Sequence, residues 1–402
     1  MNRRGLGIVL IGVKMVSLLL LQSCQNNPVE SVKLNDLLRV DIASSRPYAQ
    51  IQTTDQHCSI IISDSLTTYV RLDAQIHRRG NSTELVPKRS FLVRLLEDEP
   101  IVDLPAASSW ILLANYYDKT MLRNALAFKM AQSSLIKWTP HSQFVEVWFN
   151  NEHRGTYQLS EKVQVHPNRV NIDDDGWLVE VDARANADEP CFTTQYMEYP
   201  IRIQYPHSPV SQEQIAAIAD VFTQAEEVLF GPNFTDYTEG WRNYLDEQSW
   251  IDWYIINEIA KNTDATFFSS CFMHSGGDGR IAIGPIWDYD LAFGNTTFND
   301  TDSPEGWYVR NSNWYFRLFE DPAFVEAVKK RFAYFYSHRE DYLQFIRSNA
   351  ILLRSHAQVN EHIWHTMDRQ LWNEPLITTY DENIAYLLSW LSARLEWMNN
   401  NW

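Results

Sequence analysis

Asp288 and Asp290 are the clearest candidates for chemistry in this sequence. They lie two residues apart in the segment 284–294, where an apolar stretch ends and glycines flank the acidic pair. Hard cations such as Mg²⁺ prefer oxygen ligands, often one or two carboxylates completed by phosphate oxygens. An acidic turn after a strand has the same spacing. The motif alone therefore leaves a metal site and a structural turn as equal alternatives.

A third aspartate, Asp264, follows a strongly helical stretch and precedes a predicted hairpin over residues 267–290. The two feet of such a hairpin would bring Asp264 and Asp288 together. A carboxylate beside a metal-held phosphate can orient an attacking hydroxyl and accept its proton. For Asp264 taken alone, a polar helix end capped by Asn262 is the simpler interpretation.

A basic segment earlier in the chain could supply the cations that a phosphate needs. Arg78 and Arg79 precede Gly80, and Lys88 and Arg89 follow a few residues later. A glycine turn that offers backbone donors beside a lysine or arginine is typical of phosphate sites. Taken alone, a basic hairpin in an acidic protein is more often a solvated surface or an ion-pair network.

The composition excludes several classes of protein. The 402 residues include 51 acidic and 34 basic side chains, for a net charge of −17. Nucleic-acid phosphates repel such a chain, so we expect no nucleic-acid partner. The 45% hydrophobic content is that of a folded protein with a large core. Four cysteines are too few for a disulfide scaffold, and their spacing indicates neither a zinc site nor a redox site.

The first 23 residues have the pattern of a signal peptide, a basic start followed by an apolar stretch. Ser23-Cys24 then resembles a bacterial lipobox, in which the cysteine becomes lipidated. We therefore expect a lipid anchor at Cys24, a membrane as partner, a tether over residues 24–37, and a location in the bacterial cell envelope outside the cytoplasm. An uncleaved anchor is the alternative, but Lys14 leaves the apolar run short of the roughly 20 residues that span a membrane.

The remaining chain must position these residues, and its pattern changes once. Residues 38–205 read mostly as strands, with a hairpin that turns at Asn150-Asn151, whereas residues 206–402 read mostly as helices. This order predicts an α+β fold. Strands are expected at 58–63, 68–79, 90–96, 144–149 and 177–182, and helices at 119–133, 212–229, 247–261, 323–336, 339–367 and 384–400.

Taken together, these segments resemble the spore-coat protein H (CotH) family of atypical kinases over about residues 40–402. The resemblance rests on five blocks in the same order, which is far more specific than any one of them. The blocks are RGNST at 79–83 with KRSF at 88–91, WILLAN at 110–115 with Asp118 and LRN at 122–124, the hairpin 145–161 ending YQLSE, NEIAKNTD at 257–264, and GPIWDYDLAFG at 284–294.

The resemblance implies a protein-kinase-like two-lobed fold, with a strand-rich N-lobe over 38–205 and a helical C-lobe over 206–402. It also implies that ATP and Mg²⁺ or Mn²⁺ bind in the cleft between the lobes, and that the γ-phosphoryl group is transferred to a serine or threonine hydroxyl of a protein. Carried over to this sequence, Asp264 matches the catalytic aspartate and Asp288 the main metal ligand, which Asp290 supports.

On the nucleotide side, Lys88 is the candidate for the phosphate-contacting lysine and Glu161 for its ion-pair partner, while Arg79 belongs to the nucleotide-facing loop. One position departs from the kinase pattern. An asparagine that binds a second metal ordinarily follows the catalytic aspartate by five residues, and here Ser269 occupies that position. A catalytically inactive kinase-like surface lipoprotein that acts as a binding module is therefore the alternative.

Overall fold

The computed structural model describes residues 37–80, 86–185 and 188–402. The predicted signal peptide, Cys24 and nearly all of the predicted tether lie outside these residues, as do Asn81, Ser82 and Thr83. In the three described stretches, each helix is too short or too polar to cross a membrane.

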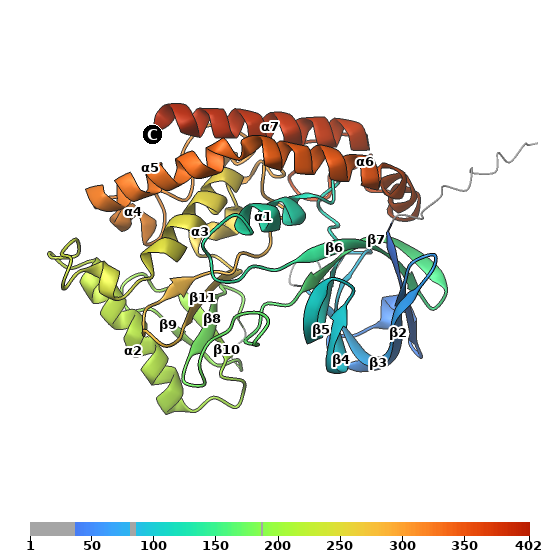
Figure 1. Ribbon diagram of the computed structural model, residues 1–402, viewed down its shortest axis with the longest axis horizontal. Coiled ribbons are helices and arrows are strands. Elements are labelled where there is room, and N and C mark those ends of the chain that lie inside the picture. Colours follow the sequence, from blue (N-terminus) through green and yellow to red (C-terminus); the bar gives the residue numbers. More distant parts are fainter. Residues whose placement is uncertain (1–36, 81–85, 186–187) are drawn as a thin grey trace, which may run out of the picture. The chain divides into compact units, whose positions relative to one another are not determined.

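The first strands form a closed seven-stranded barrel in the order β1-β2-β3-β4-β5-β7-β6 (Figure 1). Alternate side chains of these strands fill its interior, as in β2, where Cys58, Ile60 and Ile62 are buried between exposed or half-buried neighbours. The parallel pairing of β1 with β6 closes the barrel. The strands are β1 Leu38–Ser44, β2 Gln56–Ser63, β3 Thr68–Arg79, β4 Ser90–Ile101, β5 Leu104–Leu113, β6 Ser142–Phe149 and β7 Glu152–Glu161.

The hairpin between β6 and β7 confirms the predicted turn. Asn150 and Asn151 have φ angles of 51° and 65°, the left-handed values that a two-residue turn between antiparallel strands requires. Asparagine tolerates this conformation better than most other residues do. The local sequence therefore fixes where β7 begins, and thereby which of its residues reach the far end of the barrel.

A second, five-stranded sheet has the order β12-β11-β8-β10-β9. Its strands are β8 Trp177–Val181, β9 Cys191–Thr193, β10 Pro200–Tyr205, β11 Cys271–Ser275 and β12 Ala282–Ile283. The antiparallel pair β11–β12 confirms the hairpin predicted within 267–290. β11 also pairs with β8, so strands on both sides of the predicted boundary at residue 205 share one sheet.

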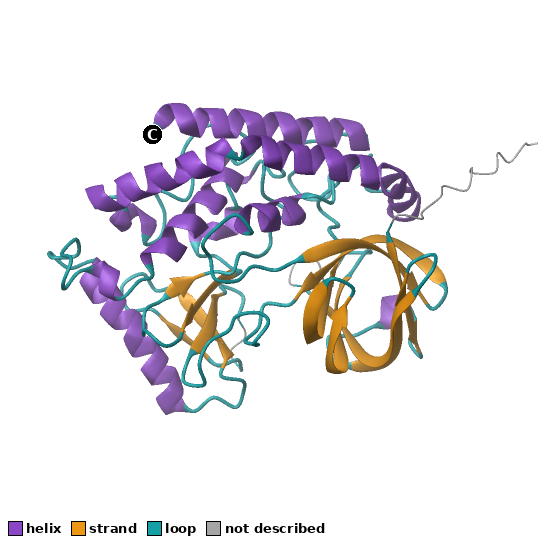
Figure 2. Ribbon diagram, viewed as in Figure 1, coloured by secondary structure: helices purple, strands orange, loops and turns teal. Residues whose placement is uncertain are grey.

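Helices dominate the C-terminal part, so the mixed α+β class is confirmed (Figure 2). The helix α3 packs against α5 and α7 (Figure 1), and its residues from Ser249 to Ala260 are all buried. The helix α1 is shorter than the predicted 119–133. The helices are α1 Arg123–Ala131, α2 Gln212–Leu229, α3 Glu247–Ala260, α4 Tyr315–Leu318, α5 Pro322–Ser337, α6 Arg339–Trp364 and α7 Tyr380–Asn401.

Candidate active site

A polar cavity of about 330 Å³ collects most of the candidate residues. The barrel contributes Arg79, the last residue of β3, and Leu113, the last residue of β5. The second sheet contributes side chains of β8, β10 and β11, and the loops after α3 and β12 contribute Asp264, Asp288 and Asp290. The structure therefore brings together all three aspartates that the sequence singled out.

The end of α3 positions Asp264. The helix ends at Ala260, its C-cap Lys261 has a left-handed φ of 43°, and a short 3-10 turn over Thr263–Thr266 follows. Asn262 caps this turn, because its Oδ1 accepts a hydrogen bond of 3.3 Å from the Asp264 amide. Burial, and then the negative charge of Asp288, raise the pKa of Asp264 to about 7, while Arg184 acts in the opposite direction.

Asp288 and Asp290 stand on either side of a fixed tyrosine. Tyr289 is fully buried, its amide donates to Asn124 Oδ1 at 2.7 Å, and its hydroxyl donates to Asn257 Oδ1 at 2.7 Å. Loss of water around the carboxylates raises the pKa values of both Asp288 and Asp290, and the charge of Asp288 raises that of Asp290 further. A cation placed between them would relieve this repulsion.

Two buried anchors hold the loop that carries these aspartates. On the α1 side, Arg123 pairs with Asp118 at 2.5 Å and donates from Nε to the Ala292 carbonyl at 3.0 Å. On the α3 side, the Phe293 amide of this loop donates to the carbonyl of Ala260, the last residue of α3, at 2.8 Å. Glu258, two residues earlier in α3, pairs with Arg394 of α7 at 2.7 Å, and both side chains are fully buried. These contacts explain why the motif blocks around Asp118 and Glu258 accompany the aspartates, although neither residue lines the cavity.

The cavity also holds cations without a carboxylate partner. Within the described part of the chain, the side chains of Arg79, Lys162 and Arg184 make no ion pair and no hydrogen bond, although all three line the cavity. Arg202 is different, because its guanidinium bonds Glu180 at 2.6 Å and Glu189 at 2.8 Å. Three lining cations are therefore available to an anionic ligand.

Lys88 lies elsewhere. It is 1% exposed, its Nζ donates to the Thr156 carbonyl, and it stands 4.7 Å from the centre of the Tyr157 ring. It is not among the cavity-lining residues. Glu161 is also buried away from the cavity and accepts hydrogen bonds from the amide and the ring of His141 at 2.8 and 3.0 Å. The structure therefore brings neither Lys88 nor Glu161 to the aspartates.

Ser269 and Ser270 contact different aspartates of the candidate site. Ser269 is 2% exposed and its hydroxyl donates to Asp264 Oδ2 at 3.3 Å, so it supports the candidate catalytic aspartate. Ser270 lines the cavity, and its hydroxyl lies 3.5 Å from Asp288 Oδ2. The hydroxyl nearest to the candidate metal ligand therefore belongs to the residue after the one that the kinase pattern indicates.

The donor set fits a divalent cation that a phosphate completes. Across the described residues, no group of three or more His, Cys, Asp or Glu side chains is arranged to hold a metal ion without another ligand. Asp288 and Asp290 nevertheless provide two carboxylates in one cavity. Their pKa values are raised, and a bound cation would lower them. Mg²⁺ is commonly bound through one or two carboxylates plus substrate phosphates, which this arrangement matches.

Several lining residues were not identified from the sequence. Lys162 directly follows the quoted block 145–161, and a cation placed just beyond a strand end was the available signal. The β8–β10 region was assigned no role, because its pairing with β11 is not visible in local patterns. From that region, Glu180, Asp182, Arg184, Arg202 and Gln204 line the cavity.

Similarity to known proteins extends over most of the chain. A family model described as CotH kinase protein matches residues 76–398. This range contains the barrel strands from the end of β3 onward, the second sheet and nearly all of the helices. No curated protein matches the sequence.

Proposed function

Because this chain belongs to the CotH kinase protein family, we propose that it is a kinase that transfers the γ-phosphoryl group of ATP to a serine or threonine hydroxyl of a protein, with Mg²⁺ or Mn²⁺ as cofactor. The observation that supports this most strongly is that one cavity contains both the three aspartates and three cations that make no ion pair with the described residues. The cations suit the phosphate chain and the carboxylates suit a metal ion and a reacting hydroxyl.

The three aspartates have two roles in this proposal. Asp288 and Asp290 would hold the metal ion, which would neutralise phosphate charge. Asp264 orients the acceptor hydroxyl and accepts its proton. Burial raises the pKa of Asp264, and a carboxylate with a raised pKa is a better proton acceptor. Arg79 faces the nucleotide from the end of β3.

A two-lobed, protein-kinase-like arrangement is part of the proposal. We place the barrel in the N-lobe and the second sheet with the helices in the C-lobe, which moves β8–β10 across the boundary predicted at residue 205, because they share a sheet with β11. The cavity has lining residues from both groups of elements, which supports this division. The acidic composition argues against a nucleic-acid substrate.

We also propose that lipidation of Cys24 anchors the protein in the bacterial cell envelope, outside the cytoplasm. The supporting observation is the basic and apolar N-terminal pattern that ends at this cysteine. Replacement Cys24→Ala should move the protein from the membrane fraction to the soluble fraction. An unchanged membrane fraction would contradict the anchor.

Incubation with γ-labelled ATP and Mg²⁺ or Mn²⁺ tests the activity. We expect label on protein serine or threonine for the wild type and its loss in Asp264→Asn, which removes the proton acceptor and keeps the shape of the side chain. Equal labelling in both proteins would contradict the role of Asp264. Binding of ATP with no labelling by any tested protein would favour the inactive binding module, for which Ser269 in place of asparagine is the supporting observation.

A further inference from the structure

Lys162 is the only lysine among the residues that line the candidate active site of the described chain. It directly follows β7, and the Arg169 side chain donates to its backbone carbonyl at 3.2 Å. That bond involves the backbone of Lys162, whose ammonium group makes no ion pair or hydrogen bond with the described residues.

Four arginines repel the charge of Lys162, while the carboxylates that line the same cavity make no ion pair with it. Burial, and then the charges of nearby arginines on three barrel and sheet strands and one loop, together lower the pKa of Lys162 to about 8. These arginines are Arg79, Arg94, Arg169 and Arg202. Nearby like charges disfavour the charged form of a lysine. An anionic ligand in the cavity would reverse this repulsion.

Extending the proposed kinase function, we infer that Lys162 is the lysine that contacts the nucleotide phosphates, together with Arg79 and Arg184 of the same cavity. Arg79 approaches from the end of β3, and its guanidinium lies 5.3 Å from the centre of the Trp287 ring. Arg184 lies over the Phe268 ring at 4.9 Å, and its charge lowers the pKa values of Asp264 and Asp288. The three cations thus come from three separate segments around one cavity.

The inference assigns to Lys162 the task that family resemblance assigned to Lys88. Lys88 is enclosed by the barrel, where its ammonium is already used by the Thr156 carbonyl and the Tyr157 ring. A phosphate could reach it only if this part of the barrel opened. Lys162 needs no such movement, because it already lines the cavity with Asp288 and Asp290.

Equilibrium binding to the full chain tests the inference without relying on activity. The ligands are ATP with Mg²⁺ and adenosine, which lacks phosphates, and the variants are Lys162→Met, Lys162→Arg and Lys88→Met. Lys330→Met is the matched control, because Lys330 is an exposed lysine of α5 that does not line the cavity. Thermal unfolding of each variant verifies that it is folded.

We expect Lys162→Met to weaken ATP binding by roughly 10- to 100-fold, the size of a lost charge-assisted hydrogen bond, and to leave adenosine binding unchanged. Lys162→Arg should recover part of the loss, whereas Lys88→Met and Lys330→Met should bind ATP like the wild type. Undiminished ATP binding by folded Lys162→Met, or a selective loss in folded Lys88→Met, would overturn the inference and leave the kinase proposal intact. A wild type that binds no ATP would instead refute the kinase proposal itself.

Discussion

Replacing Lys88 with methionine is expected to stabilise the protein at neutral pH. Burial lowers the pKa of Lys88 to about 7, and the nearby charge of Glu146 compensates only in part. A lysine in the unfolded chain titrates near 10.5. About 3.5 pH units therefore separate the two pKa values, and at about 1.4 kcal/mol per unit the fold disfavours the ammonium form by roughly 5 kcal/mol.

Removing the lysine also removes a stabilising hydrogen bond, which offsets part of the expected increase in stability. Methionine cannot donate to the Thr156 carbonyl, and loss of that bond in a buried site costs about 1–2 kcal/mol. The linear, apolar methionine side chain is close to lysine in length and suits the surrounding core. The difference predicts that Lys88→Met raises the free energy of unfolding at pH 7 by about 3 kcal/mol.

The effect has a defined pH dependence. Between pH 7 and 10.5 the unfolded chain keeps a proton on Lys88 that the folded chain releases, so the free energy of unfolding of the wild type rises with pH. Lys88→Met lacks this increment of up to about 1.4 kcal/mol per pH unit, and its advantage should shrink toward pH 10. Urea unfolding of both proteins at several pH values measures the difference. A variant that is less stable at pH 7, with the same pH slope as the wild type, would show that Lys88 is a well-paired buried cation.

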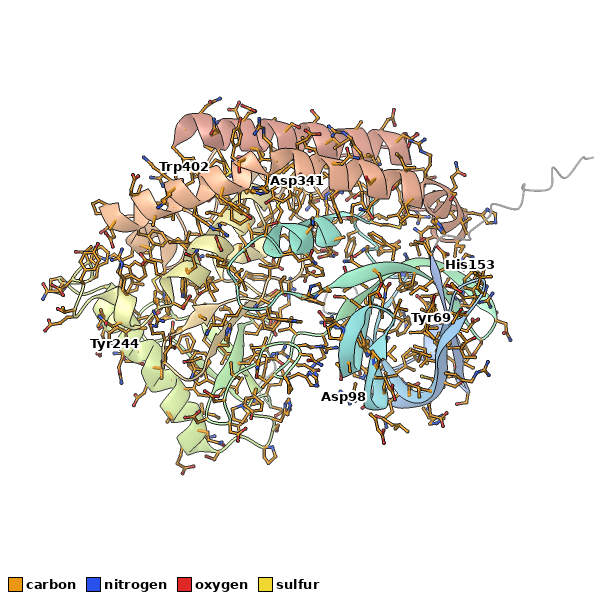
Figure 3. The ribbon with its side chains drawn as sticks, viewed as in Figure 1. Tyr69, Asp98, His153, Tyr244, Asp341 and Trp402 are labelled. Atoms are coloured by element: carbon orange, nitrogen blue, oxygen red, sulfur yellow. The ribbon has the colours of Figure 1, made fainter. Side chains whose placement is uncertain are left out.

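The buried surroundings of Lys88 are consistent with a structural role. Glu146 accepts hydrogen bonds from Thr156 at 2.7 Å and from His356 of α6 at 2.8 Å. It also bonds His153, which Figure 3 shows on the barrel. This network connects the barrel to α6, and none of its residues lines the cavity.

Three further predictions concern the candidate site and its supports. Asn124→Ala removes the acceptor of the Tyr289 amide, so we expect weaker Mg²⁺-dependent ATP binding and at least a 10-fold lower transfer rate; unchanged values would show that the loop is held without it. Glu258→Gln should lower the free energy of unfolding by about 3–5 kcal/mol, because Arg394 remains buried without its counter-charge; a loss below 1 kcal/mol in urea unfolding would contradict this. Binding of ATP should raise the pKa of Lys162 from about 8, so the complex should take up a proton near pH 8.5. Calorimetry in two buffers with different ionisation enthalpies measures this uptake. The same uptake in Lys162→Arg would show that another group binds the proton.

Much of the fold and part of the site could be predicted from the sequence. Helical periodicity placed α2 and α3 to within a residue, because their apolar positions and their caps at Ser211 and Asp246 are local features. The predicted hairpin between Asp264 and Asp288 was also a local feature, and its two feet do lie at one cavity. Local sequence patterns are sufficient to predict a contact when the two elements that make it follow each other in the chain.

The features that were not predicted depend on distant segments. The pairing of β8 with β11 joins residues about 90 positions apart, and no local pattern indicates it. The two lysines differ in the same way. Lys88 and Lys162 both adjoin the end of a strand, yet barrel closure encloses Lys88 and leaves Lys162 beside the cavity. Burial of a cation depends on the whole sheet, so charge and spacing could not distinguish the two.

Calorimetric titration of ATP into the full chain, with and without Mg²⁺, tests the proposed kinase site most directly when wild type and Asp288→Asn are compared. We expect the wild type to bind ATP more tightly with Mg²⁺ than without it, because the metal ion joins the phosphates to Asp288 and Asp290. The Asp288→Asn variant should lose most of this dependence on Mg²⁺ while remaining folded. Binding that is equally tight with and without Mg²⁺, or equally Mg²⁺-dependent in both proteins, would contradict a metal-assisted phosphate site in this cavity.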